Sequence, residues 1–258
     1  MNRLKIRTVV FGEGRPKICV PIVGTQENEI LSAAAALKKT PAQVAEWRAD
    51  WFSDILDEQK KPDLNAVTGI LKQLRTILGE MPLLFTFRTA AEGGEKSISL
   101  QDYKTLVLTA AKDGLSDLID VELFTAGESA RELTEQLHKL GAKVIISSHD
   151  FQKTPDAQVL VNRLCTMREI GADLPKIAVM PQNRRDVLTL LDATEAASRR
   201  LDCPMITMSM SGSGVISRIC GEVFGSAMTF GAFGKASAPG QIDADELAAV
   251  LELLHKNM

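Results

Sequence analysis

Short apolar runs alternate with segments of helical periodicity along almost the whole chain. A run of about four to eight apolar residues suits a buried strand, whereas apolar residues spaced three and four apart suit an amphipathic helix. The strand-like runs number eight and begin at Ile18, Val44, Leu83, Leu118, Val144, Ile177, Met205 and Ala227. Eight strands that are each followed by a helix predict an α/β fold, a closed (β/α)8 TIM barrel, rather than an open doubly wound sheet.

The segments between the runs carry the helical pattern, and turn residues mark their ends. The clearest segments span 64–78, 103–111, 133–140, 159–170, 187–197 and 247–254. Side chains that can accept a hydrogen bond from a free backbone N–H stand at several expected helix starts, namely Asp102, Thr154, Asn183 and Asp243. Pro155 suits a first helical position, and Gly141 and Gly171 suit helix ends. Ahead of the barrel, residues 5–11 and the Gly12-Glu13-Gly14 turn predict a β-hairpin.

Composition narrows the class of protein. The 258 residues contain no linker-like stretch, so we expect one domain spanning 1–258. A net charge of -3 without long charged runs indicates neither a nucleic-acid partner nor a membrane surface. No apolar stretch is long enough to span a membrane and the N-terminus lacks the apolar core of a signal peptide, so a cytoplasmic location is expected. The four cysteines and three histidines lack metal-ligand spacing, and no metal site is predicted.

Lys176 opens one of the apolar runs, and strand alternation puts Lys176, Ala178 and Met180 on the same face. Burial disfavours the ammonium form, which would leave a nucleophilic amine able to form an imine with a carbonyl compound. A lysine at a strand start can instead extend its ammonium group to solvent. Lys17 and Lys143 open two other runs in the same way, so position alone does not single out Lys176.

In a barrel of this kind, the chemistry lies at the carboxyl ends of the strands and in the loops that follow. The polar or flexible side chains at these places are Glu46, Arg48, Arg88, Glu92, His149, Asp150, Met208, Met210 and Arg218, and a long loop spans 231–241. Several have structural alternatives: Glu46 with Arg48 suits an internal ion pair, and the methionines suit core filling. Gly212-Ser213-Gly214 is weak evidence for a phosphate site, because a dinucleotide fingerprint needs a further glycine.

Three arginines at strand ends indicate an acidic substrate. A guanidinium holds a carboxylate through two parallel hydrogen bonds, and Arg48, Arg88 and Arg218 exceed what an apolar ligand requires. With one lysine and one histidine beside them, the residues predict a site for a small, anionic, oxygen-rich molecule.

Several widely separated segments, taken together, resemble the type I 3-dehydroquinate dehydratases. The matching stretches are Glu46-Trp47-Arg48, the segment 83–88 with Glu92-Gly93-Gly94, Ser148-His149-Asp150-Phe151, the segment 175–180, Val215-Ile216-Ser217-Arg218 and the segment 236–241. The resemblance implies a class I (Schiff-base) hydro-lyase of the shikimate pathway that converts 3-dehydroquinate to 3-dehydroshikimate and water. It also implies a homodimer that needs no metal or organic cofactor.

The resemblance assigns a role to each matching residue. It implies that Lys176 forms the imine, that His149 is the general acid/base, and that Glu92 positions or electrostatically tunes this histidine. Arg218 matches the residue that binds the substrate carboxylate. The other positions implied to contact the substrate or close the site are Glu46, Arg48, Arg88, Met208, Met210, Phe230, Ser237, Ala238 and Gln241. The sequence departs from some relatives at Pro21 and in the stretch 211–213.

Two other functions fit the residues. A class I aldolase would use Lys176 to cleave or form a carbon–carbon bond and would hold a phosphate near Gly212-Ser213-Gly214 and Gly234. A non-catalytic barrel would bind a small hydroxy acid without turnover or a covalent adduct. The 231–241 loop, rich in Gly, Ala and Ser, is expected to close over the site as a lid.

Overall fold

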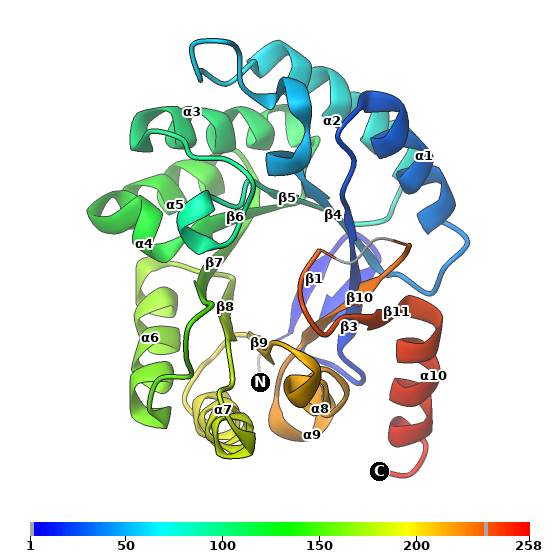
Figure 1. Cartoon of the computed structure of the whole chain (residues 1–258), viewed down its shortest axis with the longest axis vertical. Coiled ribbons are helices and arrows are strands. Elements are labelled where there is room, and N and C mark those ends of the chain that lie inside the picture. Colours follow the sequence, from blue (N-terminus) through cyan, green and yellow to red (C-terminus); the bar gives the residue numbers. More distant parts are fainter. Residues whose placement is uncertain (1–2, 235–236) are drawn as a thin grey trace.

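Parallel strands form one curled sheet with helices around it in the computed structural model, which describes residues 3–234 and 237–258 (Figure 1). Within these residues the sheet has nine strands, in the order β11-β10-β3-β4-β5-β6-β7-β8-β9. Their bounds are β3 (Lys17–Ile22), β4 (Val44–Arg48), β5 (Leu83–Thr86), β6 (Leu118–Glu122), β7 (Lys143–Asp150), β8 (Leu174–Val179), β9 (Ile206–Ser209), β10 (Met228–Ala232) and β11 (Ile242–Asp243). The eight predicted runs correspond to β3 to β10, and β11 adds a short strand beside β10.

The barrel closes between β9 and β10 without a regular ladder. Met205 and Ser226 form an isolated parallel bridge, and the Ala227 N–H donates to the Met205 carbonyl at 2.8 Å. The Ser226 hydroxyl accepts the Thr207 N–H at 3.0 Å, so a side chain takes the place of a backbone partner. The predicted (β/α)8 barrel is confirmed, with this seam as its least regular join.

Helices cover the outside of the sheet (Figure 1). The longer ones are α1 (Glu27–Leu37), α2 (Leu64–Leu78), α3 (Leu100–Ala111), α5 (Ala130–Lys139), α6 (Ala157–Ile170), α7 (Arg184–Ser198) and α10 (Ala244–His255). Short helices are α4 (Leu123–Ala126), α8 (Ile216–Ile219) and α9 (Gly221–Phe224), with 3-10 turns η1 (Ala49–Trp51), η2 (Ser53–Ile55), η3 (Ala90–Glu92), η4 (Lys112–Gly114), η5 (Gly127–Ser129) and η6 (Gly212–Gly214). Among the helices that the structure describes, none is long and apolar enough to cross a bilayer.

The helix starts correct two of the predicted caps. Asn183 and Asp243 cap α7 and α10 as expected, each accepting backbone N–H bonds. At α3 the cap is Ser99, whose hydroxyl accepts the Asp102 N–H, so Asp102 lies inside the first turn. At α6 the N-cap position is Asp156, because the Thr154 hydroxyl donates instead to the Met180 carbonyl at 3.1 Å. Pro155 therefore precedes the cap and is not the first helical residue.

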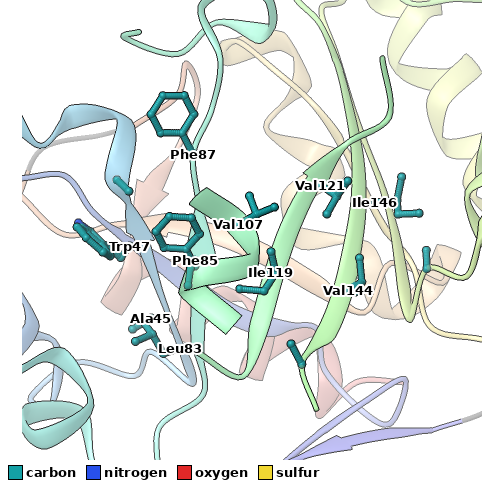
Figure 2. Packing of buried hydrophobic residues seen from close by; sticks show 14 of the residues in the cluster. Ala45, Trp47, Leu83, Phe85, Phe87, Val107, Ile119, Val121, Val144 and Ile146 are labelled. Atoms are coloured by element: carbon teal, nitrogen blue, oxygen red, sulfur yellow. The ribbon is translucent and has the colours of Figure 1, made fainter. Parts of the chain in front are cut away.

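Two apolar layers hold the barrel together. The larger lies between the sheet and the helices, where Trp47 packs edge-on against Phe85 with ring centroids 5.5 Å apart (Figure 2). The smaller fills the barrel interior with residues near the strand starts, such as Leu84, Leu118 and Ile145. Burial on both faces of the strands is the main source of stability in such a sheet.

The predicted hairpin closes the amino-terminal end of the barrel. β1 (Leu4–Ile6) pairs antiparallel with β2 (Val9–Phe11), and its apolar residues join the interior cluster. Arg7, at the turn, donates from Nε to Asp117 Oδ1 at 2.5 Å, just before β6 begins. The chain therefore reverses at Arg7 and Thr8, while the Gly12-Glu13-Gly14 segment leads on toward β3. With this end filled by apolar side chains, polar groups inside the barrel collect at the other end.

Pro21 lies in a central strand because the ladder beside it has ended. β10 pairs with β3 only as far as Cys19, and farther along β10 pairs with β11. The missing N–H of Pro21 therefore deprives β10 of no ladder bond.

Candidate active site

A cavity opens at the carboxyl ends of the strands, and the predicted site residues line it except Asp150, whose Oδ1 instead accepts the backbone N–H groups of Gln152 and Lys153. These residues are Glu46, Arg48, Arg88, Glu92, His149, Lys176, Met208, Met210, Arg218, Phe230, Ser237, Ala238 and Gln241. Gly93, Phe151 and Ala178 line it as well. The cavity therefore draws on β4, β7, β8, β9 and β10 together with loops that are far apart in the sequence.

Lys176 is the candidate lysine that lies in the cavity. It is the third residue of β8, not the first, and its side chain faces the barrel interior with 4% of its surface exposed. Lys17 and Lys143 begin their strands at the opposite end, where their Nζ atoms donate to the Glu13 carbonyl and to Asp173. Parallel strands put the first residue and the last residue at opposite ends of the barrel, so only Lys176 among the three lies beside the site.

Two groups near Nζ of Lys176 stabilise a positive charge there. Asp120 Oδ2 lies 3.7 Å from Nζ, and the centroid of the Phe230 ring lies 4.4 Å from it. A carboxylate and the face of an aromatic ring both favour a cation, whether an ammonium or a protonated imine.

His149 and Glu92 form a hydrogen-bonded pair at the edge of the cavity. Glu92 Oε2 accepts from the His149 backbone N–H at 3.0 Å and lies 2.9 Å from Nδ1 of the ring. Because Glu92 Oε2 already accepts the backbone N–H, we place the proton of the neutral imidazole on Nδ1, where it can be donated to the same oxygen. The lone pair of Nε2 is then available to a ligand. The ring is therefore oriented to accept a proton through Nε2.

Burial shifts both groups toward their neutral forms. It raises the pKa of Glu92 to about 8, although nearby Arg88 acts in the opposite direction. Burial, with added repulsion from Arg88 and Lys176, lowers the pKa of His149 well below 6.5. A histidine that stays neutral near pH 7 can act as a base.

The three arginines differ in their partners. Arg48 makes two 2.8 Å bonds to the buried carboxylate of Asp50. Arg88 pairs with Asp120 and Glu122, each at 2.9 Å. Both guanidinium groups are thus neutralised by the protein itself.

Arg218 has no acidic partner among the residues that the structure describes. It is 1% exposed, and its polar contacts are with the Pro239 carbonyl at 3.0 Å and Met208 Sδ at 4.0 Å. No described residue is a hydrogen-bond partner of its Nε, and burial lowers its pKa to about 10. Because burying a cation without a counter-charge is costly, this guanidinium suits an anionic group of a ligand in the cavity.

Three buried acidic residues near the site were missed by the sequence analysis. They are Asp50, Asp120 and Glu122, all fully buried. A signal was present, because strand alternation in the segment 118–122 puts Asp120 and Glu122 on one face, as it does Glu46 and Arg48 in β4. Charged residues that alternate within a buried strand indicate an internal ion-pair network.

The described part of the 231–241 loop lies over the cavity. Gln241 Oε1 accepts the Ser237 N–H at 2.9 Å, and Gln241 Nε2 donates to the Ser237 hydroxyl at 3.0 Å. Lys235 and Ala236, the latter part of the matching segment, lie outside the described residues. In the part of the chain that the structure covers, no three His, Cys, Asp or Glu side chains gather as potential metal ligands.

The chain is similar to known proteins over nearly its whole length. Residues 18–258 match the family model described as type I 3-dehydroquinase. The chain belongs to the type I 3-dehydroquinase family. The resemblance seen in the sequence is thereby confirmed over nearly the whole length.

Relatives within the type I 3-dehydroquinase family are similar from end to end. The 3-dehydroquinate dehydratase of Listeria monocytogenes serotype 4a is 53% identical over 256 residues, which are 99% of each chain. A crystal structure of the type I 3-dehydroquinate dehydratase from Clostridium difficile, described with covalent modified comenic acid, has a TM-score of 0.94 at 51% identity and covers 100% of this chain and 99% of that one. The Geobacillus kaustophilus enzyme gives the same TM-score at 36% identity, covering 99% and 97%.

Proposed function

We propose that this protein is a class I (Schiff-base) 3-dehydroquinate dehydratase, a hydro-lyase that converts 3-dehydroquinate to 3-dehydroshikimate and water in the shikimate pathway. The observation that carries the proposal is the buried guanidinium of Arg218, which has no acidic partner within residues 3–234 and 237–258, in the same cavity as Lys176 and the Glu92-bound His149. A cyclic keto acid needs these three functions together: a cation for its carboxylate, an amine for its ketone and a base for its α-hydrogen.

Lys176 begins the reaction. Its ammonium group first gives up a proton, and the neutral amine adds to the ketone carbon. The carbonyl oxygen then leaves as water with that proton and a second one from the nitrogen, which ends as a protonated imine. This cation is the electron sink that makes the neighbouring C–H acidic. The Asp120 carboxylate 3.7 Å away and the Phe230 ring favour that charge.

His149 then moves the proton. Nε2 takes the hydrogen beside the imine carbon, and the C–H electrons pass to nitrogen to give an enamine. The enamine electrons return, the β-hydroxyl leaves with a proton from the imidazolium, and hydrolysis of the conjugated imine releases product and Lys176. Glu92 holds the ring through Nδ1 throughout. The elimination is redox-neutral and Lys176 supplies the electron sink, so no metal or organic cofactor is needed.

The remaining cavity residues fix the substrate. Arg218 binds its carboxylate, while Glu46, Arg48 and Arg88 hold its ring hydroxyls, with the two arginines kept in place by buried acids. Met208 and Met210 provide apolar neighbours for the imine. The 231–241 loop, through Ser237, Ala238 and Gln241, closes over the bound molecule and excludes water from the imine.

The protein acts as one domain spanning 1–258, in the cytoplasm and as a homodimer. Support for the single domain comes from the relatives, which align with this chain over 99% of both lengths. No nucleic acid or membrane partner is part of the proposal.

Borohydride trapping tests the function. The protein is incubated with 3-dehydroquinate, reduced with borohydride, digested and mapped by mass spectrometry. The expected result is a stable adduct on Lys176, and an adduct on Lys17 or Lys143 refutes the assignment. Turnover of a phosphorylated sugar in place of 3-dehydroquinate would favour the aldolase alternative, and binding without turnover or adduct would favour a non-catalytic barrel.

A further inference from the structure

Asp120 lies behind Lys176 and does not line the cavity. It is fully buried on the interior face of β6, where Oδ1 accepts the Ser147 hydroxyl at 2.7 Å. Oδ2 lies 2.9 Å from Arg88 Nη2 and 3.7 Å from Lys176 Nζ. One carboxylate oxygen is therefore shared between an arginine that is always charged and a lysine that must lose a proton before it can react.

Asp120 remains a carboxylate at neutral pH. Burial acts against its ionised form, but the nearby Arg88 and Lys176 outweigh burial, and the pKa of Asp120 is lowered. A group that keeps its negative charge in this way does not carry protons during turnover, so its influence on Lys176 is electrostatic and positional.

The other charged or titratable side chains around Lys176 are of both signs. Those that line the same cavity are Glu46, Arg48, Arg88, Glu92, His149 and Arg218. On β3, beneath the site, burial raises the pKa of the Cys19 thiol, which therefore carries no charge near neutrality. The only acidic oxygen within 4 Å of Lys176 Nζ in the described part of the chain belongs to Asp120.

We propose that Asp120 is the counter-ion and positioning residue of Lys176: it aims Nζ at the cavity and balances the positive charge that this nitrogen carries before and after it condenses with the ketone. The inference rests on the proposed Schiff-base function. In the condensation the ammonium releases one proton and the amine lone pair forms the C–N bond. The carbonyl oxygen leaves as water with that proton and a second one from the nitrogen, and the positive charge returns to the same nitrogen in the protonated imine. The fixed carboxylate of Asp120 stabilises the two charged states of this nitrogen, the ammonium and the protonated imine.

Asp120→Asn tests the proposal because it keeps the shape and removes the charge. The yield of borohydride adduct on Lys176 is measured across pH for both proteins, with kcat and KM. Without its counter-ion the ammonium loses its proton more readily, so we expect the midpoint of adduct formation to move to lower pH by about one unit or more. We also expect kcat to fall about 10- to 100-fold, with KM changed far less.

Glu122→Gln is the matched control. Glu122 is equally buried and also pairs with Arg88 at 2.9 Å. It also accepts a hydrogen bond from the Thr89 hydroxyl, whereas the carboxylate beside Lys176 is that of Asp120. We expect this variant to leave the pH midpoint of adduct formation in place. A purely structural role for Asp120 would lower adduct yield at every pH without moving the midpoint, and that result overturns the proposal.

Ser147→Ala provides a second test if Asp120→Asn fails to fold. It removes the hydrogen bond to Asp120 Oδ1 but keeps the negative charge of Asp120. We expect adduct formation at the wild-type midpoint but at a lower rate, and an unchanged rate overturns the positioning role. Equal midpoint shifts in Asp120→Asn and Glu122→Gln also overturn the proposal. Wild-type protein that forms no adduct at any pH refutes the Schiff-base function itself, which separates the two failures.

Discussion

One oxygen of Glu92 holds His149 twice, because Oε2 lies 3.0 Å from the backbone nitrogen and 2.9 Å from Nδ1 of the same residue. The double contact fixes both the strand end and the ring. The other oxygen, Oε1, is buried and has no hydrogen-bond partner among the residues that the structure covers. These contacts keep the Glu92 carboxyl group in a buried position where its ionisation is unfavourable. The same carboxyl group orients His149, so its ionisation affects both the stability of the protein and the position of the base.

Replacing His149 by alanine separates imine formation from proton transfer. Lys176 and Arg218 remain in place, so we expect the borohydride adduct to form as in the wild type. Loss of the base should lower kcat by about 10²- to 10⁴-fold. Steady-state kinetics and adduct mass measured on the same preparation check both parts. Unchanged turnover would mean that another residue moves the proton.

Glu92→Gln should change how stability depends on pH. The pKa of Glu92 is raised in the folded protein, from 4.5 to about 8, so its stabilising effect is fully present below pH 4.5 and is lost as pH rises toward 8. Glutamine does not ionise, and the variant escapes this loss. Because the lowered pKa of His149 removes stability as pH falls below 6.5 in both proteins, the comparison is made above that value.

Urea unfolding at about pH 6.5 and about pH 9 measures the effect. Between these values we expect the free energy of unfolding of the wild type to fall by about 1–2 kcal/mol relative to Glu92→Gln. Parallel pH dependence in the two proteins would show that Glu92 ionises normally in the folded state.

Arg218→Met should weaken catalysis without weakening the fold. Loss of hydrogen bonds to a charged carboxylate costs about 1.5–3 kcal/mol, or about 10- to 150-fold in kcat/KM. The buried guanidinium has no acidic partner among the described residues, so its removal leaves no orphaned charge, and the melting temperature should stay equal or rise. Thermal unfolding and kcat/KM are measured together.

Arg88→Met is the comparison for that experiment. It leaves the carboxylates of Asp120 and Glu122 buried without their partner and should cost about 3–5 kcal/mol of stability. If Arg88→Met and Arg218→Met lowered the free energy of unfolding equally, the inference that buried acids pair with Arg88 but not with Arg218 would be wrong.

Gly93→Ala should disturb the turn that carries Glu92. Gly93 has a φ of +83°, and a Cβ there would lie 2.4 Å from Cε2 of Phe151. Left-handed backbone costs a non-glycine residue about 1–2 kcal/mol, and Phe151 would have to move as well. We expect lower stability and a lower kcat. Gly69→Ala in α2 is the control: a Cβ there meets nothing within 4 Å, so stability should rise by up to about 1 kcal/mol with kinetics unchanged.

Local pattern was enough to predict the barrel and the strand face that carries Lys176, but not to single out Lys176 from Lys17 and Lys143. Strand alternation acts between neighbours in the chain, so the apolar runs identified β3 to β10, and Lys176, Ala178 and Met180 were correctly assigned to one face. Helix N-caps were harder to predict, because a hydroxyl caps a helix only if it reaches a free N–H of the first turn. The Ser99 hydroxyl does so, whereas the Thr154 hydroxyl bonds to the Met180 carbonyl instead.

The sequence by itself determined the fold class, the strand ends that carry the chemistry and the residue types gathered there. Only the tertiary structure decided which arginine has no acidic partner in the part of the chain that the structure describes, since Arg48 and Arg88 are paired there and Arg218 is not. The partners of Arg88 lie more than thirty positions away in the sequence, on a neighbouring strand. Alternation depends on adjacent residues, whereas charge pairing depends on distances that exist only after the barrel has closed.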